Sequence, residues 1–148
     1  MCIIDIHSAC SYPSNVLSNF HANLFFFDGV RCGSIEGVLQ SLRYSDFEEQ
    51  KSICLLSGRK AKSMGKKKII DQTLYWKGVS FNRHSDAYQA FLFNLYNSLF
   101  VQSENFRKAL QDSIGCDLIH LIGKDDPFAT LLTNHEFISN LKRLRKLL

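Results

Sequence analysis

The spacing of apolar residues along the chain predicts a mostly helical protein. Apolar residues recur at helical intervals from Ile35 to Leu42. Ser34 in front of them is a favoured N-cap residue, so we expect a helix that runs to about Tyr44. Similar patterns predict further helices over residues 46–56, 59–64, 86–101, 104–113 and 134–147. The segment 86–101 is apolar on nearly all sides, which is typical of a helix at the centre of a domain.

Shorter apolar runs predict a few strands. The runs 24–27 and 30–32 are separated by Asp28-Gly29, a dipeptide that tolerates the positive φ angles of a tight hairpin turn. Two more strands are expected over 73–76 and 117–122, and irregular backbone over 1–22 and 78–84. Helices combined with a few short strands indicate the α+β class.

The composition is that of an ordinary globular domain. Of the 148 residues, 45% are hydrophobic and 22% are charged, which excludes a disordered chain. A domain of this length buries roughly two-thirds of the surface that its unfolded chain exposes, so it needs neither a metal nor a disulfide to fold. No linker rich in proline, glycine or serine and no internal repeat divides the sequence. We therefore expect one compact domain over residues 1–148.

The formal net charge of +4 comes from two basic clusters. They consist of Lys62, Lys66, Lys67 and Lys68, and of Lys142, Arg143, Arg145 and Lys146. A solvated loop and solvated helix ends are the simplest interpretation, because a nucleic-acid-binding protein spreads its basic residues over a face with readout elements between them. A weak attraction to phosphate-bearing ligands is the alternative.

Cysteine and histidine spacings favour neither disulfides nor a metal site. The five cysteines are an odd number without a C-x-x-C pair, so free thiols in a reducing compartment are expected. The five histidines lack paired-ligand spacing, and we expect no metal and no cofactor. The N-terminal segment does not resemble a signal peptide, and the longest uncharged run, 87–103, is too polar to span a bilayer. These features predict a cytoplasmic protein without a membrane partner.

Glu36 is the first candidate for chemistry. It lies in the first turn of a predicted helix, where the helix N-terminus favours an ionised carboxylate even when it is partly buried. A purely local role, in which it caps backbone N–H groups, is the alternative. Gln40 and Arg43 follow at i+4 and i+7, so the acid, the amide and the guanidinium share one helix face. Such a row can line a polar pocket, although spacing alone favours an exposed face.

Three motifs in order resemble the opening of the NADAR/YbiA-like domain family. They are Leu17-Ser18-Asn19-Phe20, then Phe27-Asp28-Gly29, then Ser34-Ile35-Glu36 with Gln40. The family pattern is L/F-S-N-F, a short hydrophobic hairpin containing D-G, and S/T-x-E-x-x-x-Q-x-x-K/R. A looser similarity continues to Arg145, so the resemblance covers nearly the whole chain.

The resemblance implies a fold and an activity. Family members are compact, mainly helical α+β domains. They are N-glycosidases that act on ribosylamino-pyrimidine phosphates of riboflavin biosynthesis or remove ADP-ribose from modified guanine bases. The implied function is hydrolysis of the C–N glycosidic bond of a phosphorylated ribosyl or ADP-ribosyl compound, either a free metabolite or ADP-ribosylated nucleic acid.

The resemblance also implies which residues do the chemistry. Glu36 corresponds to the family's essential acid. It would stabilise an oxocarbenium-like transition state and position or deprotonate the attacking water. Asn19 and Gln40 correspond to substrate-contacting positions. Asp126 lies roughly where the family has a D-x-x-W-G segment, which is itself absent here.

The departing base and the phosphate need further groups. Trp76, which corresponds to the family's pocket tryptophan, or Phe20 would offer the base an aromatic surface. By itself, Trp76 would more often be a core residue. Arg43 and Arg83 are candidates to hold the phosphate through paired hydrogen bonds. For Arg83 the alternative is a salt bridge at the entry of the following helix, for example with Asp86.

Two departures from the family pattern leave other functions open. Gly37 stands where the family commonly has His, and Arg43 where it usually has Lys. One alternative is a module that binds ADP-ribose or a nucleotide without turnover. Another is an interaction protein that presents its basic C-terminal helix to an acidic partner.

Overall fold

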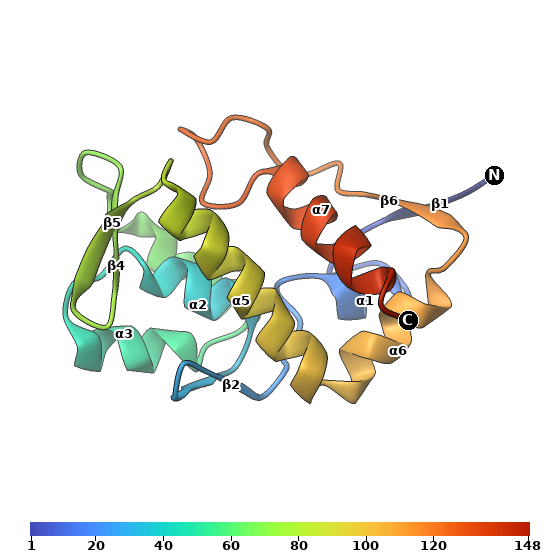
Figure 1. Cartoon of the computed structure of the whole chain (residues 1–148), viewed down its shortest axis with the longest axis horizontal. Helices are drawn as coiled ribbons and strands as arrows, with labels where there is room; N and C mark the ends of the chain where they lie inside the picture. The colour runs from blue at the N-terminus through green and yellow to red at the C-terminus, as the bar shows by residue number, and fades with distance from the viewer.

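Helix α5 (Asp86–Gln102) crosses the middle of the molecule in the computed structural model, which describes residues 1 to 148 (Figure 1). Two groups of elements flank it. One group comprises β2 (Phe25–Phe27), β3 (Val30–Cys32), α2 (Ile35–Ser41), α3 (Phe47–Cys54), β4 (Thr73–Trp76) and β5 (Val79–Asn82). The other comprises β1 (Cys2–Asp5), α1 (Ser14–Leu17), α6 (Glu104–Asp112), β6 (Cys116–Ile119) and α7 (Asn134–Arg145). Helix α4 (Gly58–Ser63) and the 3₁₀ turn η1 (Met64–Lys66) pack against α2.

The strands form three separate two-stranded sheets. β2 and β3 make the predicted antiparallel hairpin, with positive φ angles at Asp28 (49°) and Gly29 (76°). β4 and β5 make a second hairpin. β1 and β6 pair in parallel, and their register joins Cys2 to Cys116 and Asp5 to Ile119. The α+β class expected from the sequence is confirmed.

Two segments expected to be irregular are ordered. The prediction for 78–84 is wrong, because Lys77 and Gly78 both take positive φ angles (51° and 85°) and turn the chain into β5. Lys-Gly is a weaker hairpin signal than Asn-Gly or Asp-Gly, which explains the miss. The prediction for 1–22 is wrong because β1 is stabilised by β6, a partner more than a hundred residues away in sequence.

The predicted helices are all present, and polar caps begin most of them. The Ser34 hydroxyl accepts a hydrogen bond from the Gly37 N–H at 2.9 Å, so the α2 cap is as expected. Ser85 caps α5 in the same way. Thr133 and Glu136 form a capping box at the start of α7. The first residue of each of these helices is therefore determined by a capping residue next to it in the sequence.

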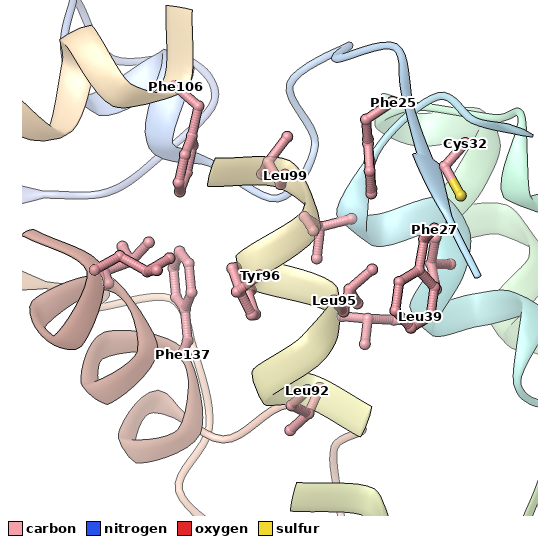
Figure 2. Packing of buried hydrophobic residues seen from close by; sticks show 14 of the residues in the cluster. Phe25, Phe27, Cys32, Leu39, Leu92, Leu95, Tyr96, Leu99, Phe106 and Phe137 are labelled. Atoms are coloured by element: carbon pink, nitrogen blue, oxygen red, sulfur yellow. The ribbon is translucent and has the colours of Figure 1, made fainter. Parts of the chain in front are cut away.

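The core is built on both sides of α5 (Figure 2). Leu92, Leu95, Tyr96 and Leu99 of this helix are buried. They point toward Phe106 and Phe137 of one group of elements and toward Phe25, Phe27 and Leu39 of the other. The central position expected for the 86–101 segment is therefore confirmed. None of the helices is both long enough and apolar enough to cross a membrane.

One disulfide corrects the expectation of five free thiols. Cys2 and Cys116, which the parallel register of β1 and β6 places side by side, are bonded with their Cα atoms 4.5 Å apart. Cys10, Cys32 and Cys54 are free. Cysteine spacing could not indicate this pair, because 114 residues separate its members and only the strand pairing brings them together.

Candidate active site

A cavity of about 600 Å³ opens where α2 meets the segments that follow β1 and β6. Five of the residues selected from the sequence line it: Asn19, Phe20, Glu36, Gln40 and Arg43. The motif L-S-N-F and the motif S-I-E are adjacent in space because the backbone N–H of Glu36 donates to the Asn19 carbonyl at 3.0 Å. The start of α2 and the loop before β2 therefore form one wall of the cavity.

Glu36 and Gln40 of α2 and Arg43 of the turn that follows it form a hydrogen-bonded row. The Gln40 side-chain nitrogen donates to Glu36 Oε1 at 2.8 Å. Arg43 Nε donates to Gln40 Oε1 at 2.7 Å, and Arg43 Nη1 donates to the Lys67 carbonyl at 2.9 Å. The row faces the cavity, and the exposed helix face favoured by spacing alone is not observed.

The environment of Glu36 favours its neutral form more than water does. Burial raises its pKa above the ordinary glutamate value. The hydrogen bond from Gln40 and the charges of Lys62, Arg43 and His120 act in the opposite direction without cancelling the effect of burial. A carboxylate of this kind is a stronger base than a solvated one.

A hydrogen bond from Tyr96 positions the side chain of Asn19. The tyrosine hydroxyl donates to Asn19 Oδ1 at 2.6 Å. Tyr96 lies in the core, and desolvation raises its pKa well above the usual value, so it stays a neutral donor. The Asn19 amide nitrogen makes no hydrogen bond within the protein. It is therefore free to donate to a molecule in the cavity.

The remaining charges around the cavity are positive. Arg59, Lys62, Lys66 and Lys124 line it with Arg43, while Glu36 is its one acidic residue. None of these four further cations belongs to an ion pair of the protein. Two lysines of the 62–68 cluster thus border the cavity, whereas the simplest interpretation of the sequence put them in a solvated loop.

A second cavity of about 650 Å³ adjoins the first. Asn15 and His21 line only the second cavity, and the residues common to both are His7, Ser8, Phe20, Arg59, Lys62 and Ile122. The Lys62 ammonium lies over the Phe20 ring, 5.7 Å from its centroid. The shared wall therefore presents an aromatic ring and two cations to both spaces.

Trp76 and Asp126 do not line either cavity. Trp76 is a core residue of β4 that packs against Phe27 and Phe91, and its indole N–H donates to Asp28 Oδ2 at 2.9 Å. Asp126 is exposed and accepts a hydrogen bond from the Phe128 N–H within its own turn. The structure thus does not bring these two predicted substrate-binding residues to the site.

Arg83 is also absent from the cavity. Its Nη2 and Nη1 atoms donate to the Glu136 carboxylate at 2.7 and 3.0 Å, and its Nε donates to the Thr130 carbonyl at 3.1 Å. The side chain is 2% exposed. All three of its nitrogens are hydrogen-bonded within the protein and the side chain is buried away from the cavity, so the salt-bridge alternative is the one observed, with Glu136 of α7 as the partner instead of Asp86.

The comparisons with known proteins identify the family. The profile of the bacteriophage protein GP30.3 family matches residues 11–146. The chain belongs to this family. A relative from Enterobacteria phage T4, an uncharacterized 17.1 kDa protein in the Gp30-rIII intergenic region, is 40% identical over 149 residues, or 96% of each chain.

This GP30.3 family chain has the fold of YbiA. The NMR structure of the E. coli protein YbiA superposes with a TM-score of 0.64 over 99% of this chain and 84% of that one. The sequence identity is 20%, so the likeness concerns the fold. It confirms the resemblance to the NADAR/YbiA-like family that the three N-terminal motifs indicated.

Two histidines that line the cavity, His7 and His120, have no local sequence signal that could have indicated them. Each follows one strand of the parallel pair, β1 or β6, so the strand pairing delivers both to the same place. His120 Nδ1 lies 2.7 Å from the Ile6 carbonyl. Only knowledge of this long-range pairing could have placed the two imidazoles in the same cavity as Glu36.

Proposed function

We propose that the protein is an N-glycosidase that hydrolyses the C–N glycosidic bond of a phosphorylated ribosyl or ADP-ribosyl compound. The observation that carries the proposal is the single acidic residue, Glu36, in a cavity otherwise bordered by cations. A ribosyl cation forming in the transition state needs one nearby carboxylate, and the phosphate of the same substrate needs the cations.

Glu36 has two tasks in this proposal. Its carboxylate stabilises the positive charge that develops on the ribose as the C–N bond lengthens. It also orients the attacking water and accepts a proton from it. The raised pKa of Glu36, which burial causes, makes the carboxylate better suited to the second task.

The substrate contacts differ in part from those expected from the sequence. Arg59 and Lys62, which line the cavity and belong to no ion pair, are better placed to hold a phosphate than Arg83, which is buried outside the cavity and paired with Glu136. Phe20 offers the departing base an aromatic surface at the cavity, because it is less buried than Phe137, and Trp76 lies in the core. Asn19 contributes its free amide nitrogen.

Base release measured by chromatography tests the proposal. Wild type and Glu36→Gln are incubated with an ADP-ribosylated guanine nucleoside and with ribosylamino-pyrimidine phosphates. Wild type is expected to release base from at least one compound, and Glu36→Gln to lose that activity while keeping its fold. Glu104→Gln is the matched control, because Glu104 also follows a serine N-cap but is exposed on α6. Full activity in Glu36→Gln would contradict the proposal.

A binding module without turnover is the second candidate. It is favoured by Gly37, where the family commonly has His. A Cβ atom there would lie 2.6 Å from the Leu56 carbonyl oxygen, so α2 and α3 pack too closely for any side chain. Measurable affinity for ADP-ribose, with no base released after prolonged incubation, would support this function over catalysis.

The basic C-terminal helix offers less support for an interaction function. Arg143 donates to Asn97 and Asn140, and Arg145 donates to the carbonyls of Ser113 and Cys116. Two of the four basic side chains of this cluster are therefore engaged within the protein. Deleting residues 142–148 and measuring association with an acidic partner remains its direct test.

A further inference from the structure

We propose that His120 is a second catalytic residue, and that its Nε2 atom donates the proton taken up by the departing base nitrogen. The inference rests on the proposed glycosidase function, which assigns a role to Glu36 and leaves the leaving group unassisted. A nitrogen base that departs as an anion is a poor leaving group, so a proton donor on its side of the bond lowers the barrier.

The imidazole of His120 is held in one orientation. A carbonyl oxygen can only accept, so the 2.7 Å contact with Ile6 means that Nδ1 carries a hydrogen. The ring lies edge-on to Phe137, with centroids 5.3 Å apart. A Cβ atom on Gly123 would come within 2.5 Å of His120 Cδ2, so the backbone closes tightly over the ring.

This tautomer leaves Nε2 as the nitrogen available for proton transfer. Nε2 makes no hydrogen bond within the protein. Because Nδ1 keeps its hydrogen in both the neutral and the charged ring, Nε2 is the nitrogen that gains and loses a proton. His120 lines the same cavity as Glu36 but comes from the other group of elements. A positive charge on its ring lowers the pKa of Glu36.

The other basic groups at the cavity are less suited to this step. Arginine does not give up its proton near neutral pH, and Lys62 and Lys66 are exposed. His7 accepts a backbone hydrogen bond from Ala9 at its Nδ1, at 2.9 Å. In this contact Nδ1 accepts, so the hydrogen of the neutral ring is on Nε2, the opposite tautomer to that of His120.

Each bond broken in the proposed reaction is matched by a bond that forms. The C1′–N bond breaks, and its electron pair stays on the base nitrogen, which takes the proton from His120 Nε2. The oxygen of water bonds to C1′, and the proton of that water passes to the Glu36 carboxylate. The products are the free base and the ribosyl compound with a C1′ hydroxyl. Proton transfer from Glu36 to His120 through solvent restores both groups.

Several charged groups surround His120 and bear on any pH dependence. Glu36 faces it from α2, and His7 follows β1. Asp5 at the end of β1 accepts from the Leu121 N–H, and Lys124 lies on the loop of His120 itself. On α7, His135 is exposed and Glu136 is paired with Arg83.

Two probes with different leaving groups test the inference. One is the compound from which wild type releases base; the other is 4-nitrophenyl ribofuranoside 5-phosphate, whose nitrophenolate leaves without a proton. In His120→Asn the amide nitrogen replaces Nδ1 and keeps the bond to Ile6, while Nε2 is lost. We expect kcat for the nitrogen base to fall about 10²- to 10⁴-fold, and kcat for the nitrophenyl probe to fall less than about tenfold.

The wild-type pH profile is the second measurement, and it needs no variant to fold. Because only the nitrogen base needs a proton donor, its release is expected to decline toward alkaline pH, whereas activity on the nitrophenyl probe does not share that limb. Equal losses on both probes in His120→Asn and in His120→Gln, or no loss, overturn the role of His120 alone. If wild type releases base from none of the nitrogen-base compounds and no nitrophenolate from the second probe, the glycosidase function is overturned, and this inference with it.

Discussion

The carboxylate of Glu36 and the amide of Gln40, one turn apart on α2, are joined by a hydrogen bond of 2.8 Å. The opposite end of the same amide accepts from Arg43. Gln40 therefore connects the acid to a guanidinium without a direct ion pair. Burial raises the pKa of Glu36 and this hydrogen bond lowers it, so the amide limits how basic the carboxylate becomes.

Replacing Gln40 by methionine should shift the pH dependence of catalysis. Without the donor at Gln40, the pKa of Glu36 is expected to rise further, so the acidic limb of kcat/KM moves to higher pH. Activity at neutral pH should fall on the order of tenfold, since a hydrogen bond to a charged group is lost. The measurement is base release between pH 4 and 9. Gln111→Met, on the exposed face of α6, is the control and should match wild type.

Glu36→Gln should be more stable than wild type at neutral pH. Because burial raises the pKa of Glu36 in the folded state, the native protein holds this proton more tightly than the unfolded chain. Stability is therefore lost as the pH rises through the folded pKa, and a glutamine avoids that loss. Thermal unfolding should show a higher Tm for the variant at pH 7.5 and no difference near pH 4, where both side chains are neutral. The prediction would be contradicted if Glu36→Gln had a lower Tm than wild type at pH 7.5 and the same Tm near pH 4.

Local patterns predicted those parts of the fold that neighbouring residues determine. Ser34 and Ser85 cap the helices expected to follow them, and Asp28-Gly29 makes the expected hairpin turn. The row from Glu36 to Arg43 follows from helical geometry alone. Its orientation toward a cavity does not, because that depends on the loop containing Asn19.

The rest of the site depends on contacts between distant segments. His7 and His120 meet because β1 pairs with β6, and no spacing within either segment indicates it. Arg83 was a plausible phosphate ligand only because its partner Glu136, 53 residues further along the chain, could not be identified from the sequence. Trp76 likewise needed its neighbours on the two hairpins and α5 before it could be placed in the core.

The cations where the two cavities meet should govern affinity for the phosphate. Arg59→Gln and Lys62→Gln are each expected to raise KM for a phosphorylated substrate about 10- to 100-fold, the effect of losing one hydrogen bond to a charged group. The unphosphorylated analogue should show no such change. Lys142→Gln, on exposed α7 surface, serves as the control. Equal KM values for variants and wild type would mean that the phosphate binds elsewhere.

Arg83 should matter for stability and not for substrate binding. Arg83→Met leaves the Glu136 carboxylate buried without its main partner, which costs about 3–5 kcal/mol. Replacing both residues by methionine should recover much of the loss, because no unpaired charge remains. Denaturant unfolding measures both effects. At denaturant concentrations below the unfolding transition, the KM of Arg83→Met should equal that of wild type. A raised KM would instead indicate that Arg83 binds the substrate.

The same ion pair should make the protein sensitive to acid. Burial alone would raise the pKa of Glu136, but the hydrogen bonds from Arg83, the Thr133 N–H and Gln89 bring it below the ordinary value. A carboxyl with a lowered folded pKa contributes stability above its unfolded pKa, and that contribution is lost as the pH falls through the folded one. Wild type should therefore lose more stability than the double methionine variant when the pH is lowered from 6 to 3.

Two glycines beside the site should separate folding from function. A Cβ atom at Gly37 would meet backbone, with the Leu56 and Cys54 carbonyl oxygens 2.6 and 2.9 Å away, so Gly37→Ala must push α2 from α3. Overpacking of this kind costs about 1–3 kcal/mol.

At Gly65 the nearest atom is the side-chain Oε1 of Gln40, at 3.0 Å, which can move. Gly65→Ala is thus expected to keep the Tm within a few degrees, since the clash is with the end of a side chain, and to lower kcat by displacing the amide that contacts Glu36. Thermal unfolding and base release on both variants check this, and a loss of stability in Gly65→Ala as large as in Gly37→Ala would contradict it.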